Sequence, residues 1–334
     1  MTVAGSVAAV RHARWAAPAV LVLLLAGCGG TDSSAPQASP SSPRTTATHP
    51  THSASPPTSR HTRKPPSTPA SPAGAGVSKL LVLVVENHSL DEMRNEMPWT
   101  YALAQRYGYA TAYRAMTHPS LPNYLAVAGG STFGITDDHD PSAHPLSGPS
   151  VFGAALDAGL TARVYADAMP SPCLLTSADQ YVVRHNPWTY FVDERSQCSA
   201  SDVPLTGFAD DVRAGRLPDA GMVVPDICHD AHNCSLAIAD AWLQQEVGLA
   251  MSGPDFRAGR LAIVVTADED DGSQDNTVLT VVVHPSLRHR VVASPLTQLS
   301  LSRLYTEVLG TAPLRDAAAA PSMATAFHLP LARS

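Results

Sequence analysis

The side chains best suited to chemistry are a serine and two acidic pairs that lie far apart in the chain. Ser120 stands in the stretch THPSLPNY, and the pairs are Glu86-Asn87 and Asp268-Glu269. Carboxylate and amide oxygens are hard ligands that suit a divalent cation. A serine hydroxyl beside such a cation can act as an attacking group close to centres that stabilise negative charge. The residue types therefore point to metal-assisted attack by a hydroxyl.

The sequence around Ser120 allows a structural role as well. Pro122 fits the first turn of a helix, and serine is a good N-cap. A helix N-terminus also offers free N–H groups and a positive dipole end that can hold phosphate oxygens. We therefore expect Ser120 to cap a helix and to act as nucleophile. The chain has no G-x-S-x-G elbow, and Tyr124 stands where a sulfatase pattern requires arginine, which disfavours both of those hydrolase classes.

Two apolar runs must position the acidic pairs. The run KLLVLVVEN has the β-branched content of a strand buried on both faces and ends at Glu86, while RLAIVVTADEDDG has the same form and ends at Asp268. Ligands of open α/β sheets bind just beyond the carboxyl ends of the strands. One polar strand end most simply faces water, but two at equivalent positions indicate a site.

The remaining pattern alternates between strands and helices. Such alternation predicts an α/β domain with a mainly parallel sheet flanked by helices. Further strands are predicted at 162–166, 221–226 and 277–283, and helices at 98–108, 121–129, 151–159, 235–251 and 299–309.

The N-terminus has the layout of an export signal. Basic residues precede the apolar run 16–26, which is about half the roughly 20 residues that cross a bilayer. The sequence LAGC resembles a bacterial lipobox, which implies cleavage after residue 27 and acylation of Cys28. A plain signal peptide with a buried cysteine is the alternative.

The segment between the signal and the first strand differs sharply in composition. From Thr31 to Gly76, 28 of 46 residues are Ser, Thr or Pro, and such a segment cannot bury enough apolar surface to fold. We interpret it as a disordered tether. The expected organisation is a signal peptide at 1–27, a lipidated cysteine and tether at 28–76, and one folded domain at 77–334. This organisation predicts an extracytoplasmic lipoprotein that contacts the membrane through its N-terminal lipid.

The charge of the folded part argues against a nucleic-acid partner. Six of the 22 basic residues and one of the 29 acidic residues precede residue 77, which leaves 16 basic and 28 acidic side chains, a formal charge of −12. A nucleic-acid binder would need a basic footprint. An anionic substrate must therefore be held by local groups.

The cysteines that remain after Cys28 form an even set, which favours disulfides in an exported chain. Three connectivities are possible, and short loop closure favours the local pairs. A zinc site in CHDAHNC, built from Cys228, His229, His232 and Cys234, is the alternative. The favoured pairs are Cys173 with Cys198 and Cys228 with Cys234.

Several stretches, taken in order, resemble the bacterial phosphoesterase family that contains acid phosphatases and phospholipases C. The resemblance covers about residues 79–310 and is greatest to the small secreted acid phosphatases, including phosphatidylinositol-3-phosphatases. It implies an alkaline-phosphatase-like fold and an acid pH optimum. The stretches are VVENHSLDEM, THPSLPNYLAVAGGSTFGIT, RHNPWTYF, DAHNCSLAIADAWL and TADEDDGSQDN.

The resemblance also implies roles for single residues. Ser120 matches the nucleophile, and Asn123 matches an amide near the phosphate. The histidines that we expect at the site are His185 and His232, with His118 as a further candidate because it lies two residues before Ser120. The expected metal ligands are Glu86, Asn87, Asp230, Asp268 and Glu269.

The chain departs from the phospholipase C branch after the second acidic pair. That branch has His-Gly-Gly and then Asp-His, whereas this chain has Asp270-Asp271-Gly272 and then Asp275-Asn276. The difference disfavours a phospholipase C and leaves the number of metal ions open.

These observations predict a monomeric phosphatase. Ser120 would attack a phosphomonoester and form a phosphoserine, which water would then cleave. The cofactor would be a divalent ion (Mg, Mn, Ca, Zn or Fe), and the substrate a small phosphorylated molecule or a phosphoinositide head group. The alternatives are a phosphodiesterase of phospholipase C type and a non-catalytic, metal-binding surface lipoprotein.

Overall fold

A computed structural model describes residues 76–333 of the chain. The predicted signal peptide, the cysteine predicted to carry lipid (Cys28) and all of the tether except Gly76 lie outside the described residues, so the predicted domain boundaries stay predictions. Among residues 76–333, no helix has both the length and the apolarity that crossing a membrane requires.

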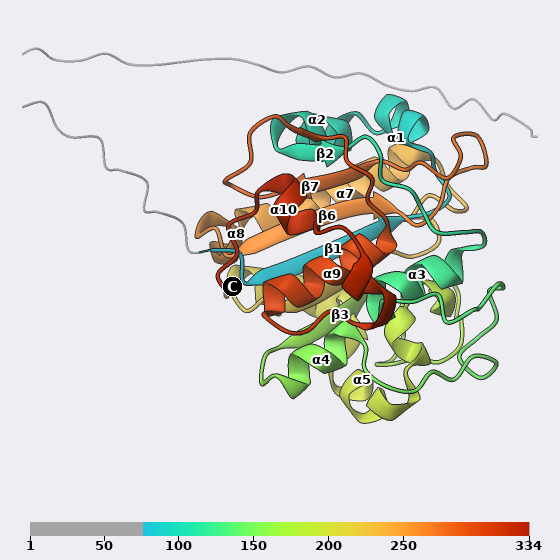
Figure 1. Cartoon of the computed structure of the whole chain (residues 1–334). Coiled ribbons are helices and arrows are strands. Elements are labelled where there is room, and N and C mark those ends of the chain that lie inside the picture. The colour runs from blue at the N-terminus through green and yellow to red at the C-terminus, as the bar shows by residue number, and fades with distance from the viewer. Residues whose placement is uncertain (1–75, 334) are drawn as a thin grey trace, which may run out of the picture. The chain divides into compact units, whose positions relative to one another are not determined.

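An eight-stranded sheet carries the fold, with the strand order β4-β3-β5-β1-β6-β7-β2-β8 (Figure 1). Neighbouring strands are parallel except where β7 pairs with β6 and with β2. The central strands are apolar and buried on both faces, as expected for a parallel sheet covered by helices. The strands are β1 (Lys79–Val85), β2 (Gly108–Ala110), β3 (Ala162–Ala166), β4 (Asp202–Pro204), β5 (Ala220–Val224), β6 (Leu261–Ala267), β7 (Thr280–Val283) and β8 (Arg290–Val292).

Helices cover both faces of this sheet. Figure 1 shows α3 and α9 in front of the strands and α7 behind them; α3 and α4 both contact α9, while α7 contacts α2, α6 and α8. The α-helices are α1 (Leu90–Glu96), α2 (Pro98–Arg106), α3 (Ser120–Gly129), α4 (Val151–Asp157), α5 (Arg195–Ser201), α6 (Phe208–Arg213), α7 (Leu236–Ser252), α8 (Pro254–Arg257), α9 (Gln298–Leu309) and α10 (Met323–Phe327). The 3-10 helices are η1 (Val183–His185), η2 (Pro187–Tyr190), η3 (Val192–Glu194), η4 (Leu205–Gly207) and η5 (Arg315–Ala319).

The predicted α/β architecture is confirmed. Each predicted strand and helix has a counterpart, with β3 and α3 close to the expected bounds. The prediction missed β2, β4 and β8, because three residues are too few to show a period. The strand expected at 277–283 begins later, at Thr280, and runs antiparallel to β6.

Both predicted disulfides are present, Cys173–Cys198 and Cys228–Cys234. The zinc alternative is wrong, because the sulfur atoms of Cys228 and Cys234 are bonded to each other. Disulfides are typical of oxidising compartments and indicate that the protein works outside the cytoplasm.

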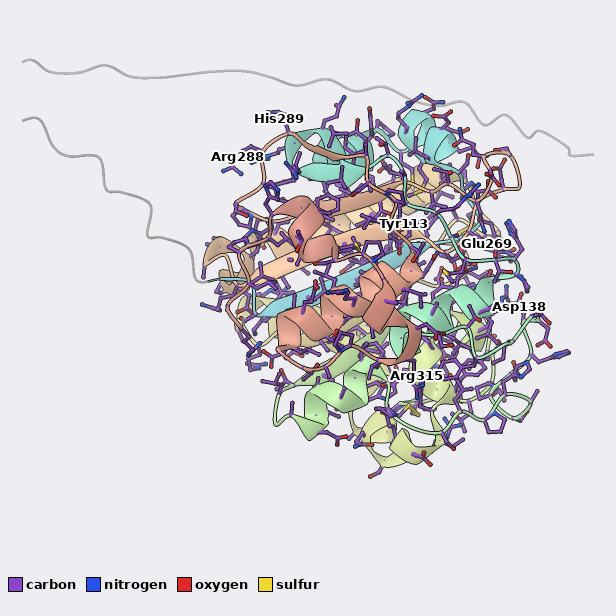
Figure 2. The ribbon with its side chains drawn as sticks, in the orientation of Figure 1. Tyr113, Asp138, Glu269, Arg288, His289 and Arg315 are labelled. Carbon is purple, nitrogen blue, oxygen red and sulfur yellow. A yellow bond between two sulfur atoms is a disulfide. The ribbon has the colours of Figure 1, made fainter. Side chains whose placement is uncertain are left out.

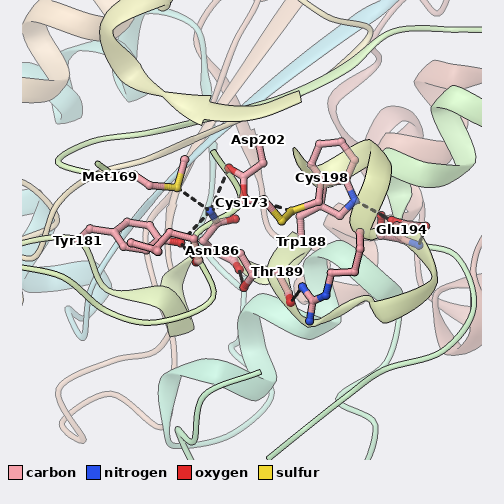
Figure 3. The surroundings of a disulfide bond; sticks show 12 residues. Met169, Cys173, Tyr181, Asn186, Trp188, Thr189, Glu194, Cys198 and Asp202 are labelled. Atoms are coloured by element: carbon pink, nitrogen blue, oxygen red, sulfur yellow. Dashed lines mark hydrogen bonds between the residues drawn. A yellow bond between two sulfur atoms is a disulfide. The ribbon is translucent and has the colours of Figure 1, made fainter. Parts of the chain in front are cut away.

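A buried polar pair anchors the loop beside the first disulfide (Figure 3). The amide Nδ2 of Asn186 donates to the two carboxyl oxygens of Asp202 at 3.0 and 2.9 Å and also contacts the hydroxyl of Tyr181 at 3.1 Å. Asn186 and Asp202 are both fully buried. These contacts hold the segment that carries His185 against the start of β4.

Asp202 predicts a pH dependence of stability. Burial raises the pKa of its carboxyl to about 7, although hydrogen bonds from Asn186 act in the opposite direction. The folded chain therefore keeps a proton that the unfolded chain releases. The contribution of Asp202 to stability is complete below about pH 4 and is lost as the pH rises to about 7. Over this range the free energy of unfolding falls by up to about 1.4 kcal/mol per pH unit.

The variant Asp202→Asn isolates this effect. We expect the free energy of unfolding of the wild type to fall, relative to that of the variant, between about pH 4 and about pH 7. Urea titrations at several pH values measure the difference, with the exposed Asp157→Asn in α4 as the matched control. Wild type and Asp202→Asn curves that stay parallel over this range would show that Asp202 does not titrate this way.

Candidate active site

The two acidic pairs meet at the carboxyl ends of neighbouring strands. In the parallel pairing of β1 with β6, Val85 lies opposite Ala267, so Glu86 and Asp268 follow at adjacent positions. The backbone N–H of Asn87 donates to Oδ1 of Asp268 at 2.9 Å. Asn87 has a φ of 53°, a left-handed conformation that asparagine tolerates better than most residues. The expected juxtaposition of the two pairs is thus present.

Ser120 lies directly against the first pair. Its Oγ donates to Oε2 of Glu86 at 3.0 Å and is 3.5 Å from Oδ1 of Asn87, and the residue is 3% exposed. The expectation that Ser120 caps the helix is wrong, because Pro119 is the N-cap and Ser120 is the first residue of α3. The free N–H of Leu121 bonds instead to Oδ1 of Asp138 at 2.9 Å. The hydroxyl of Ser120 is therefore directed to the carboxylates and not to the helix backbone.

His185 bridges two carboxylates behind Ser120. Its Nε2 lies 3.2 Å from Oε2 of Glu86 and its Nδ1 lies 3.0 Å from Oδ2 of Asp230, and all three residues are buried. Burial disfavours the imidazolium, but Glu86 and Asp230 raise the pKa of His185 to about 9. Burial also disfavours the carboxylate of Glu86, yet the charge of His185 and hydrogen bonds from His185, Tyr124 and Ser120 lower the pKa of Glu86 to about 2.

Glu269 lies on the side of the site nearer to solvent. Nδ1 of His118 is 3.3 Å from Oε1 of Glu269, and Nε2 of His118 is 3.4 Å from Oδ1 of Asp270. The His118 side chain is 49% exposed, so it lies at the mouth of the site. Burial raises the pKa of Glu269 to about 7, although the charge of His118 and its hydrogen bond act in the opposite direction.

Asn123 is fully buried and holds the segment that leads into Ser120. Its Oδ1 accepts from the N–H groups of Met116 and Thr117 at 3.0 and 3.2 Å. Its Nδ2 donates to the Thr117 carbonyl at 2.7 Å and to Oε2 of Glu269 at 3.2 Å. These contacts occupy both polar atoms of the amide, so a contact between Asn123 and phosphate stays a prediction.

His232 is exposed, and the centroid of its ring lies 6.2 Å from that of His185. Its Nδ1 contacts Oδ1 of Asn233 at 2.9 Å, and its Nε2 contacts Nη2 of Arg184 at 3.3 Å. Its backbone N–H donates to Oδ1 of Asp230 at 2.8 Å. The Cys228–Cys234 disulfide closes this loop and so supports the position of Asp230.

The donor set fits a divalent cation. Oδ2 of Asp268 is buried without a hydrogen-bond partner, and burial together with the charges of Glu86 and Glu269 raises the pKa of Asp268 well above its ordinary value. Metal-ligating atoms of Glu86, His185 and Asp230 lie within 4.8 Å of one another. Buried carboxylates of one sign are stable when they coordinate a cation. His185 lies against two of the ligand candidates that the sequence indicated, Glu86 and Asp230.

The sequence reasoning missed Tyr124, Asp138 and Arg184. The hydroxyl of Tyr124 bonds to Oε1 of Glu86, and its ring stacks on His185 at a centroid distance of 5.3 Å. Tyr124 lies four residues after Ser120, so the helical period could have placed both on one face of α3. Asp138 lies in a loop that has no periodic signal. In Figure 2, Asp138 and Glu269 lie at the same edge of the domain, beside α3.

The architecture is that of the alkaline phosphatase superfamily. A solved structure of a protein in that superfamily from Vibrio parahaemolyticus matches with a TM-score of 0.50 and 11% sequence identity, over 73% of this chain and 70% of that one. At this identity the match establishes the fold alone. The serine among buried carboxylates lies beyond the carboxyl ends of β1 and β6, which is where ligands of open α/β sheets bind.

The chain belongs to the Phosphoesterase family, whose model matches residues 91–291. It is 30% identical over 236 residues to a phosphatidylinositol-3-phosphatase of Mycobacterium tuberculosis, covering 68% of this chain and 76% of that protein. It is 29% identical over 185 residues to a phosphate-repressible acid phosphatase of Penicillium chrysogenum, covering 52% of this chain and 44% of that protein. The chain is thus a phosphoric ester hydrolase of the acid phosphatase kind, and it spans less than half the length of the fungal relative.

Proposed function

We propose that the protein hydrolyses phosphomonoesters and that Ser120 is the nucleophile. The observation that carries this proposal is the contact of 3.0 Å between Oγ of Ser120 and Oε2 of Glu86, at the point where the ends of β1 and β6 meet. A hydroxyl at this position is held among carboxylates that fit a cation. The family membership supports an ester of phosphoric acid as the substrate.

The hydroxyl of Ser120 needs a positive charge close to its oxygen. With its pKa lowered to about 2, Glu86 orients the hydroxyl but is too weak a base to remove its proton near neutral pH. The residues that would hold a divalent cation are Glu86, Asn87, Asp268 and Glu269, with Asp230 and His185 adjoining. Such an ion, when bound, lowers the pKa of an attacking hydroxyl and offsets the charge on phosphoryl oxygens.

The reaction then proceeds in two displacements. The hydroxyl of Ser120 gives up its proton to solvent, and Oγ forms a bond to phosphorus as the bond to the leaving oxygen breaks. The leaving oxygen takes up a proton, so the products are a phosphoserine and an alcohol. A water molecule next attacks phosphorus, and Oγ leaves to regenerate the serine and release phosphate.

We assign protonation of the leaving oxygen to His118. His185 is 1% exposed and both of its ring nitrogens face carboxylates, so it supports Glu86 and does not reach a departing group. His232 uses Nε2 as acceptor for Arg184 and Nδ1 as donor to Asn233. His118 lies two residues before Ser120 and is half-exposed, which suits a group that meets the leaving oxygen.

The name of the mycobacterial relative suggests a phosphoinositide as one substrate. A lipid anchor at Cys28 would keep the domain at the outer face of the cell membrane, where such head groups or small secreted phosphomonoesters are within reach. We therefore propose phosphoinositides and soluble phosphomonoesters as the substrate classes to compare.

A pair of substrates with the same aryl leaving group separates a phosphomonoesterase from a phosphodiesterase. We expect kcat/KM to be at least about 100-fold higher for the monoester, about 2.7 kcal/mol of transition-state stabilisation, because a second ester group removes one charged oxygen. Phosphate or alcohol release with and without a chelator measures this. Faster cleavage of the diester would replace the proposal with the phospholipase C alternative, and no cleavage of either would favour a non-catalytic protein.

A further inference from the structure

Arg184 is a cation at the edge of a strongly acidic site, and the reaction as described gives it no task. It precedes His185 in η1, and while His185 is buried under Glu86, the Arg184 side chain is 22% exposed. Its Nη2 lies 3.3 Å from Nε2 of His232. Its Nε is buried and has no hydrogen-bond partner.

The nearest carboxylate to this guanidinium is that of Asp138. Nε of Arg184 lies 3.7 Å from Oδ2 of Asp138, which is longer than a hydrogen bond. The other oxygen of Asp138 accepts the backbone N–H of Leu121, the residue after Ser120, at 2.9 Å. Asp138 thus lies between Arg184 and the start of α3, next to the nucleophile.

The charge balance of the site calls for such a cation. Glu86, Asp268 and Glu269 surround Ser120 with carboxylates, and a phosphomonoester brings up to two further negative charges. A guanidinium presents N–H groups in a planar fork that matches phosphate oxygens, and charge-assisted bonds of this kind are the strong ones. Asp138, by contrast, makes no hydrogen bond to Arg184.

We propose that Arg184 binds the non-bridging oxygens of the phosphoryl group, and that Asp138 is a weak internal anion which the phosphoryl group displaces from the guanidinium. This proposal deepens the proposed function and rests on the same site. Arg184 would act on phosphate affinity, and its role does not require that Ser120 be the nucleophile.

Binding of inorganic phosphate tests this directly. The protein is the metal-loaded full chain carrying Ser120→Ala, and calorimetric titration gives the Kd for phosphate. We expect Arg184→Met to raise this Kd about 10- to 100-fold, as expected for losing charged hydrogen bonds, and Arg184→Lys to raise it less. Asp138→Asn should lower the Kd, because it keeps an acceptor for Leu121 but removes the competing charge.

The matched control is Arg213→Met, which removes an exposed arginine that pairs with Asp210 on α6. It should leave the Kd unchanged, and circular dichroism and melting temperature check that each variant folds. Arg184→Lys keeps the test decisive if Arg184→Met does not fold. An unchanged Kd in the folded Arg184 variants, or no phosphate binding before Arg184 is changed, would overturn the proposal. Because Ser120→Ala is the background, a failure of the nucleophile assignment leaves this result readable.

Discussion

Ser120→Ala is expected to lower kcat on an aryl phosphomonoester at least about 10³-fold while the protein stays folded. The reason is that the variant has no oxygen to form the phosphoenzyme, although the cation ligands and phosphate contacts remain. Loss of a nucleophile in a covalent mechanism removes the chemical step, so the effect falls on kcat. Initial rates over a range of substrate concentrations, on protein of unchanged melting temperature, measure it.

Ser235→Ala is the matched control for this prediction. Ser235 also stands at the start of a helix, as the N-cap of α7, but it is exposed and its side chain makes no cap hydrogen bond. We expect wild-type kcat in this variant. A Ser120→Ala enzyme that keeps more than about a tenth of the wild-type kcat would show that Ser120 is not the nucleophile.

Asp268→Asn is expected to have two effects of opposite sign. Activity should fall at least about 100-fold, because the variant loses a carboxylate that would hold the cation. The metal-stripped protein should melt at a higher temperature than the metal-stripped wild type. In the wild type, the buried Oδ2 of Asp268 has no hydrogen-bond partner, and burial together with the charges of Glu86 and Glu269 raises the pKa of Asp268. Replacing this carboxylate with an amide therefore relieves repulsion among the buried carboxylates.

The two readouts are a phosphate-release assay and thermal unfolding after dialysis against a chelator. Asp271→Asn serves as the control, because Asp271 is exposed in the same loop and its carboxylate accepts from Ser273. It should keep both the activity and the melting temperature. If Asp268→Asn retained wild-type activity, or if chelation left wild-type activity intact, no cation at this position would be needed for hydrolysis.

Much of the fold could be predicted because the central strands are long, apolar and different in composition from their surroundings. The run that became β1 is followed by a polar pair, and the strand ends at Val85, one residue before the predicted end at Glu86. The short edge strands could not be found in this way. β4, for example, is formed by Asp202, Val203 and Pro204, and only its pairing with β3 makes it a strand.

The part of the site that could be predicted consists of the residues that directly follow the central strands. Glu86 and Asp268 meet because parallel neighbouring strands end at the same edge of the sheet, a rule that needs no coordinates. The position of His185 between Glu86 and Asp230 depends on three separate segments, so no local pattern indicates it. The cap assignment for Ser120 failed because Asp138, in a loop after α3, supplies the partner for the helix N-terminus.

The tertiary contacts also change which histidine suits which task. From the sequence, His185 and His232 were expected at the site, with His118 as a further candidate. In the folded protein His185 is buried, and its contacts with Glu86 and Asp230, which raise its pKa to about 9, make it a support for these two carboxylates. A half-exposed His118 beside Glu269 then becomes the acid candidate, which the spacing to Ser120 alone left open.

The stereochemistry of phosphoryl transfer tests the central claim most directly. The substrate is a phosphomonoester whose phosphorus is chiral through oxygen isotopes, and the enzyme transfers the phosphoryl group to an added alcohol acceptor. Each in-line displacement inverts the configuration at phosphorus. Attack by Ser120 followed by attack of the acceptor on the phosphoserine predicts net retention in the product. Net inversion would mean a single direct displacement and would contradict a covalent role for Ser120.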